Sequence, residues 1–248
     1  CGTTGESPTL SHSEHERVIA LTVEYAAGRV PVIAGTGSNS TAEAIELTQA
    51  ADKLGVDGML VIAPYYNRPG QAGIIAHFKA VAASTEKPII MYNIPKRTGV
   101  NMEPVTIIEL SRVANITGIK ESAGSIEQIM AIIAGTTDFS VLTGDDALLF
   151  PLCALGGHGG ICTSSHFLPG EWVRLVDLCR EGKLAEAREL HYRLLPLAQT
   201  LFCEPNPTPV KAGLEIIGIP VGPPRLPMLP ASEMCRENVA KVVRSLGL

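Results

Sequence analysis

Six short apolar runs, each followed by a polar loop and a helical pattern, constrain the fold of this chain more than any other feature. These runs occupy residues 30–34, 58–63, 88–92, 116–120, 140–143 and 160–163. Continuous apolar runs are typical of strands buried on both faces, and the intervening helices supply the crossovers that parallel strands require. The pattern therefore predicts an α/β fold built on a parallel sheet.

The strands recur roughly every thirty residues, which matches a βα repeat. A (β/α)8 barrel needs eight strands and about 250 residues. Residues 1–7 are typical of the tail of a strand and the loop after it. We therefore expect a TIM barrel that starts at the end of strand 2 and lacks its N-terminal strand–helix unit in this chain. A doubly wound six-stranded sheet is the alternative, and it would bind its ligand at a topological switch point.

Helical patterns occupy both the intervals between the strands and the C-terminal part of the chain. Between the strands we expect helices at 41–54, 72–84, 104–113, 126–134 and 147–154, and after Gly170 at 171–180, 184–202, 208–217 and 232–246. The helix at 171–180 would complete the ring around the sheet, and the last three would form an extension. The predicted division is a barrel region at 1–180 and a C-terminal helical extension at 181–248.

Composition excludes several classes of function. The net charge is −5 and no basic stripe is present, so nucleic acid is not an expected partner. No segment has the length and apolarity of a membrane span. The six cysteines form no C-x-x-C pair, which is typical of reduced thiols in a cytoplasmic protein. No Cys/His cluster has metal-ligand spacing, so the residues indicate no metal site.

Chemistry in a parallel α/β fold belongs at the carboxyl ends of the strands. Lys120 ends an apolar strand there, where burial would favour its neutral form. A neutral amine can attack a carbonyl and form a Schiff base. The alternative is a structural ion pair with an acid on the next strand end, such as Asp145. Position alone leaves both interpretations open.

Other polar side chains follow the same strand ends. Tyr65, Tyr66 and Tyr92 could pass protons, although each could also pack at the rim of the sheet. Thr3 and Thr4 could bind a carboxylate or cap a strand. The guanidinium of Arg97 suits a bidentate carboxylate but could also lie in solvent.

Six motifs together resemble a known family. They are GTTGES at 2–7, PYYNRP at 64–69, YNIPKRTG at 92–99, GIKE at 118–121, GDD at 144–146 and NPTPVK at 206–211. Over all 248 residues the chain resembles the dihydrodipicolinate synthase family of pyruvate-dependent class I aldolases, which also includes N-acetylneuraminate lyase. Members of that family have a further strand–helix unit before the first motif.

The resemblance implies a condensation of pyruvate with aspartate semialdehyde, the first committed step of the diaminopimelate route to lysine. Lys120 would form the Schiff base without a cofactor. Tyr92, Thr3 and Tyr66 would form a proton relay, Tyr66 reaching in from a neighbouring subunit of a dimer or tetramer. The implied substrate-binding residues are Thr4, Arg97, Gly144 and Ile161.

The resemblance also implies feedback inhibition by L-lysine, bound in a cleft at a dimer interface. The matching positions are Ser7, His12, His15, Asn39, Glu43 and Tyr65. A helix N-terminus with solvated histidines is the alternative interpretation of His12 and His15. For the chain as a whole, the alternatives are another pyruvate-dependent lyase, acting on a sugar acid, or a non-catalytic or truncated relative.

Overall fold

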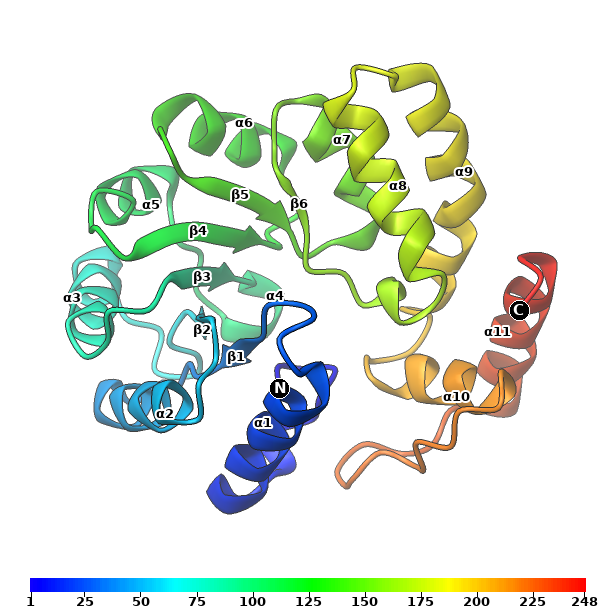
Figure 1. The fold of residues 1–248 in the computed structure, drawn as a ribbon, viewed down its shortest axis with the longest axis horizontal. Coiled ribbons are helices and arrows are strands. Elements are labelled where there is room, and N and C mark those ends of the chain that lie inside the picture. The colour runs from blue at the N-terminus through cyan, green and yellow to red at the C-terminus, as the bar shows by residue number, and fades with distance from the viewer.

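A computed structural model describes all 248 residues and contains one six-stranded parallel sheet. The strands are β1 (Ile33–Gly35), β2 (Gly58–Ile62), β3 (Ile89–Asn93), β4 (Ile116–Glu121), β5 (Ser140–Thr143) and β6 (Gly159–Gly160). They pair in sequence order, and the sheet is curled, with helices along its outer side (Figure 1). Because the order contains no switch point, the alternative of a doubly wound sheet is wrong.

The helices follow the strands in the alternation that the sequence predicts. They are α1 (His12–Ala26), α2 (Thr41–Lys53), α3 (Gln71–Ala82), α4 (Pro95–Thr98), α5 (Pro104–Leu110), α6 (Ile126–Gly135), α7 (Leu149–Ala154), α8 (Pro169–Arg180), α9 (Leu184–Thr200), α10 (Thr208–Ile216) and α11 (Glu233–Ser245). Serine hydroxyls that accept backbone N–H groups start four of them, α1, α2, α6 and α11. None of the helices combines the length and the apolar character needed to cross a membrane.

The N-terminal segment differs from the sequence-based expectation in one way. Residues 1–7 form no strand, because the carbonyls of Gly2 and Thr3 accept the turn N–H groups of Ser7 and Glu6 at 3.3 and 3.1 Å. The helix α1 begins at His12, as the alternative interpretation of His12 and His15 had it, and a capping box starts it. The backbone N–H of Ser11 donates to Glu14 Oε2 at 2.9 Å, and the backbone N–H of Glu14 donates to Ser11 Oγ at 3.3 Å.

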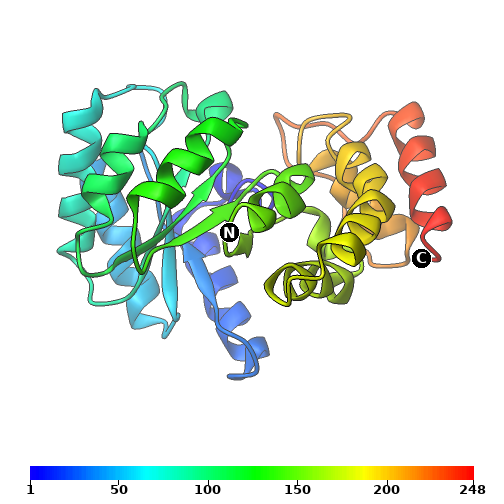
Figure 2. The ribbon, with the colours of Figure 1, turned by 90° about the horizontal axis from the view of Figure 1, so that it is seen from above.

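Two hydrophobic cores hold the molecule together. The first joins the strands to the helices that cover them, with Met59, Met91 and Ile119 fully buried at its centre. The second surrounds Phe167 and Trp172 and packs α8 and α9 against α10 and α11. Figure 2 shows the two parts side by side, the C-terminal helices forming a separate lobe beside the sheet.

Two ion pairs fasten the C-terminal segment to the N-terminal loop. Lys211 Nζ donates to Glu6 Oε2 at 2.6 Å, and each of these side chains is only 15% exposed. Arg225 binds both carboxylate oxygens of Glu14 at 2.8 and 2.9 Å, and its backbone N–H donates to Glu6. Burial alone would raise the pKa of Glu6, but hydrogen bonds from Lys211 and Arg225 lower it. The Glu6 carboxylate is therefore held ionised beside the loop that carries Thr3 and Thr4.

We expect Lys211→Met to lower the free energy of unfolding by about 3 kcal/mol, because it leaves the Glu6 carboxylate half-buried without its cation. The control is Lys79→Met, which breaks the exposed Lys79–Glu109 pair of 2.8 Å and should cost under about 1 kcal/mol. Urea unfolding followed by circular dichroism measures both. Equal losses in the two variants would contradict the importance of the Glu6 pair.

Candidate active site

A cavity of about 300 Å³ opens at the carboxyl ends of the strands. Seven of the eight residues predicted for catalysis and substrate binding line it, although they come from widely separated parts of the chain. They are Thr3, Thr4, Tyr92, Arg97, Lys120, Gly144 and Ile161. The parallel arrangement of the strands explains the convergence, because the loops after successive strands meet at one edge of the sheet.

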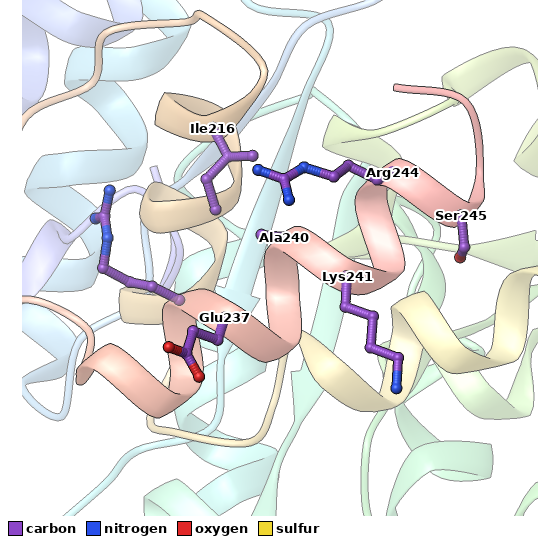
Figure 3. A pocket seen from close by; sticks show the side chains of 7 residues that line it. Ile216, Glu237, Ala240, Lys241, Arg244 and Ser245 are labelled. Carbon is purple, nitrogen blue, oxygen red and sulfur yellow. The ribbon is translucent and has the colours of Figure 1, made fainter.

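A larger hollow of about 720 Å³ lies on the C-terminal lobe, but its lysine, Lys241, is exposed to solvent. It is a wide groove over α10 and α11, lined mainly by charged side chains, and Figure 3 shows Arg244 extending across it towards Ile216. Lys241 and Glu237 project from α11 beside it (Figure 3). We therefore place the candidate active site in the smaller cavity at the strand ends.

Lys120 reaches the cavity from the end of β4. Its Nζ lies 4.3 Å from the centroid of the Tyr92 ring, and no carboxylate lies within 4.0 Å of it. Burial lowers the pKa of Lys120 below its usual 10.5. The alternative of an ion pair with Asp145 is therefore wrong. The Asp145 carboxylate accepts the N–H of Ala147 at 3.2 Å. The geometry leaves the amine free for chemistry.

Asp146 is the carboxylate that influences Lys120, but its oxygens are occupied elsewhere. They accept the backbone N–H of Thr163 at 3.1 Å and the N–H and hydroxyl of Ser164, both at 2.5 Å. Burial raises the pKa of Asp146, while these hydrogen bonds oppose the rise. The side chain therefore contributes to the local field without pairing with the amine.

Tyr92 is 7% exposed, and burial raises the pKa of its phenol. The phenol therefore remains protonated at neutral pH and can donate a proton or a hydrogen bond beside Lys120. Ser122 is a residue that the sequence analysis missed. Its buried hydroxyl has no hydrogen-bond partner within 3.5 Å, but it lies near the Tyr92 phenol and opposes the rise of that pKa.

Gly144 forms the wall of the cavity opposite Lys120 and Ser122. A β-carbon at this position would overlap the Cε of Lys120 and the hydroxyl of Ser122. Because residue 144 has no side chain, the space beside it is available to the Lys120 side chain.

Thr4, Arg97 and Asn206 form the polar part of the cavity. Asn206 Nδ2 donates to Thr4 Oγ1 at 2.9 Å, and Arg97 Nη2 donates to the carbonyl of Asn206 at 3.4 Å. Thr4 Oγ1 also lies 3.4 Å from Thr163 Oγ1. Asn206 Oδ1 is buried and unpartnered, so this acceptor is unsatisfied in the structure. Because 202 residues separate Thr4 from Asn206, local sequence patterns could not reveal this contact.

The predicted relay tyrosine Tyr66 does not line this cavity. Its side chain is 88% exposed, and its backbone has a positive φ of 70°. The neighbouring Tyr65 is 37% exposed. Both side chains therefore face the outside of this chain, beyond the end of β2.

Some of the residues predicted to bind L-lysine lie together near the start of α2. Glu43 accepts from Ser38 Oγ, and its Oε1 lies 3.0 Å from His12 Nε2. The Asn39 carbonyl accepts from Asn67, which follows the two tyrosines, at 2.9 Å. Ser7 lies in the turn Ser7–Thr9, and His15 is 6% exposed in α1. The solvated state considered for both histidines holds only for His12, since His15 is buried.

Comparison with known proteins places this site in a family. The model of the Dihydrodipicolinate synthetase family matches residues 1–246. The 4-hydroxy-tetrahydrodipicolinate synthase of Syntrophus aciditrophicus is 51% identical over 249 residues, covering 100% of this chain and 86% of that relative.

Two solved structures of synthases are also similar to this chain. The lysine-bound enzyme from Cyanidioschyzon merolae is 43% identical with a TM-score of 0.97, and the match covers 100% of this chain and 85% of that one. The pyruvate complex of the synthase from Acinetobacter baumannii is 40% identical, also with a TM-score of 0.97, and covers 99% and 85%. With the cavity, its lysine and its motifs all present, this chain belongs to the dihydrodipicolinate synthetase family.

Proposed function

We propose that this chain is a 4-hydroxy-tetrahydrodipicolinate synthase, a lyase that condenses pyruvate with aspartate semialdehyde. The observation that carries the proposal is the Lys120 amine, which lies in the strand-end cavity without an ion pair. Burial lowers the pKa of this amine and so increases the share of its neutral, nucleophilic form. The amine attacks the keto carbon of pyruvate, water leaves, and a Schiff base forms. Loss of a methyl proton then gives the enamine that attacks the aldehyde, so no metal or organic cofactor is needed.

The surrounding groups divide the remaining work. Tyr92 and Thr3 lie in the cavity and pass protons to and from the developing intermediates. Tyr66, exposed in this chain, completes the relay in a neighbouring subunit of a homodimer or homotetramer. Thr4 and the backbone near Ile161 hold the pyruvate carboxylate, and Gly144 leaves room for the adduct.

Arg97 and Asn206 bind the second substrate. The Arg97 guanidinium suits the carboxylate of aspartate semialdehyde. Asn206 lines the same cavity and would supply a second polar contact to that molecule. The two recognition groups are adjacent because Arg97 donates to the backbone carbonyl of Asn206.

The architecture supports this proposal. The curled sheet would supply six of the eight strands of a (β/α)8 barrel, and the active cavity lies where barrels of this kind place their chemistry. We retain the predicted division into a barrel region at 1–180 and a helical extension at 181–248. Asn206 then comes from the extension, which gives it a part in the site. The enzyme would work in the cytoplasm, without a membrane or nucleic-acid partner.

We expect sodium borohydride to trap pyruvate on Lys120 in the wild-type protein, because reduction of the Schiff base makes the bond permanent. Peptide mass spectrometry should find the adduct on the peptide that contains Lys120, and Lys120→Ala should abolish it. Lys79→Ala, an exposed lysine on α3, is the control and should trap normally. A folded wild-type protein that forms no adduct would contradict the catalytic proposal and favour the non-catalytic relative.

A trapped adduct alone would not separate the synthase from a sugar-acid lyase of the same family. Coupled assays should show condensation with aspartate semialdehyde and no cleavage of N-acetylneuraminate or ketodeoxy sugar acids. The reverse preference would establish the alternative.

We expect Arg97→Ala to lower kcat/KM for aspartate semialdehyde about 100-fold, since a charge-assisted hydrogen bond is worth about 1.5–3 kcal/mol. The trapping of pyruvate should be nearly unchanged, because Arg97 acts on the second substrate. Arg112→Ala, at an exposed position after α5, is the control. An equal loss of pyruvate trapping would show that Arg97 binds pyruvate or supports the fold instead.

We also propose that L-lysine inhibits the enzyme at the cleft formed by Ser7, His12, His15, Asn39, Glu43 and Tyr65. The carboxylate of Glu43 is placed to pair with the ammonium of the ligand, and Tyr65 adjoins the relay residue Tyr66. This adjacency gives a physical connection between the two sites, which allosteric coupling requires.

Millimolar L-lysine should therefore inhibit condensation, and Glu43→Gln should remove most of the inhibition because it removes the opposing charge. Glu46→Gln, one turn further along α2 and exposed, is the matched control and should remain inhibited. Initial rates against L-lysine concentration provide the measurement. Full activity of the wild type at millimolar L-lysine would refute the proposed regulation.

A further inference from the structure

A network of four polar side chains, two of them buried and two partly buried, lies behind the ends of β3 and β4, on the side away from the cavity. We call it the Glu121 network; its members are Asn93, Asn101, Glu121 and Gln128. Asn93 Nδ2 donates to both carboxylate oxygens of Glu121, at 3.1 and 3.0 Å. Gln128 Nε2 donates to Glu121 Oε2 at 3.0 Å, and the N–H of Ala123 donates to Oε1 at 2.6 Å.

Burying this carboxylate is costly, and no cation compensates for it. Glu121 is 1% exposed, and no lysine, arginine or histidine nitrogen lies within 4.0 Å of its oxygens. Burial raises its pKa, and the hydrogen bonds from Asn93, Ala123 and Gln128 oppose the rise. An apolar residue would fill the space without this cost. The position therefore needs the directional bonds that a carboxylate makes.

The register of the strands shows which groups these bonds position. Asn93 pairs with Glu121, and one residue earlier Tyr92 pairs with Lys120. Successive side chains of a strand point to opposite faces. Tyr92 and Lys120 consequently face the cavity, while Asn93 and Glu121 join the same two strands directly behind them. This contact lies at the last paired residues, where a parallel ladder is otherwise least constrained.

The network also reaches the loop that follows the Arg97 helix. Asn93 Oδ1 accepts the N–H of Met102 at 3.0 Å, and Asn93 Nδ2 donates to Asn101 Oδ1 at 2.8 Å. Asn101 Nδ2 in turn donates to Gln128 Oε1 at 2.9 Å. The four side chains thus tie the strand ends to the loop after α4 and to the first turn of α6.

We propose that Glu121 is a positioning residue, which holds the ends of β3 and β4 so that the Lys120 amine and the Tyr92 phenol keep a reactive arrangement. This role rests on the proposed Schiff-base function. Glu121 touches no substrate, and its effect passes through the backbone of the two strands. Glu121 is the one charged side chain among the hydrogen-bonded groups of the network.

Two substitutions that preserve shape separate positioning from packing. Glu121→Gln replaces one accepting oxygen by a donor, which then faces the Asn93 or Gln128 amide or the Ala123 N–H. Asn93→Asp places a second carboxylate against Glu121. In the double variant Asn93→Asp/Glu121→Gln the carboxylate has moved from β4 to β3. The amides of Asn101 and Gln128 can then turn over and restore most of the network with its direction reversed.

The measurement is the rate constant for pyruvate adduct formation by rapid quench with borohydride, together with kcat and KM. We expect Glu121→Gln to lower the rate constant about 10-fold and Asn93→Asp about 100-fold, with circular dichroism showing folded protein. The double variant should react faster than Asn93→Asp alone. Its rate constant should be well above the value expected if the two single losses multiplied, because the residues are coupled.

Asn115→Asp is the control for a general loss of stability. Asn115 precedes β4 at its other end, and its amide donates to the carbonyls of Ala82 and Thr85 at 2.9 and 2.8 Å. This variant should unfold more easily, yet its folded molecules should form the adduct at the wild-type rate.

The possible failures are distinct. Wild-type rate constants in Glu121→Gln, or losses that simply multiply in the double variant, would overturn the positioning role and leave the Schiff-base function intact. A lower fraction of folded protein with an unchanged rate constant would also overturn it, because it would show a structural role only. A wild-type protein that forms no adduct would overturn both proposals.

Discussion

The chemistry proposed for this chain depends on a lysine amine that is kept out of water and out of an ion pair. Burial favours the neutral form of Lys120, and a nearby carboxylate could cancel this effect by pairing with the ammonium. The structure prevents such pairing, because the backbone N–H groups of Thr163 and Ser164 and the Ser164 hydroxyl occupy the oxygens of Asp146. The hydrogen bonds from Thr163 and Ser164 to Asp146 thus keep the Lys120 amine on β4 nucleophilic.

The parallel sheet converts this local arrangement into a site. Apolar strands pack against helices along their length, and polar groups gather at one edge, where the loops meet. Tyr92 and Lys120 face the cavity, while Asn93 and Glu121 join the same strands from behind. The C-terminal lobe closes the edge by supplying Asn206. The partly buried ion pair between Lys211 and Glu6 joins that lobe to the loop of Thr3 and Thr4.

Much of this arrangement could be predicted from the sequence, because periodicity determines the strands and their ends locate the chemistry. The capping box of Ser11 and Glu14 is a local signal for the start of α1. Asn206 and the partners of Asp146 could not be found in this way, since tertiary packing alone brings them to the cavity. The roles proposed for Tyr66 and the L-lysine cleft follow from family resemblance, because they involve a neighbouring subunit and a bound ligand.

The pKa of Lys120 is the most direct test of this account. It can be measured by NMR titration of protein carrying [13Cε]lysine, with the Lys120 signal assigned by comparison with Lys120→Arg. We expect a midpoint below the ordinary value of 10.5, so that the reactive neutral amine increases as the pH rises through this lowered midpoint. A midpoint at or above 10.5 would show a solvated or ion-paired ammonium and would contradict the central claim.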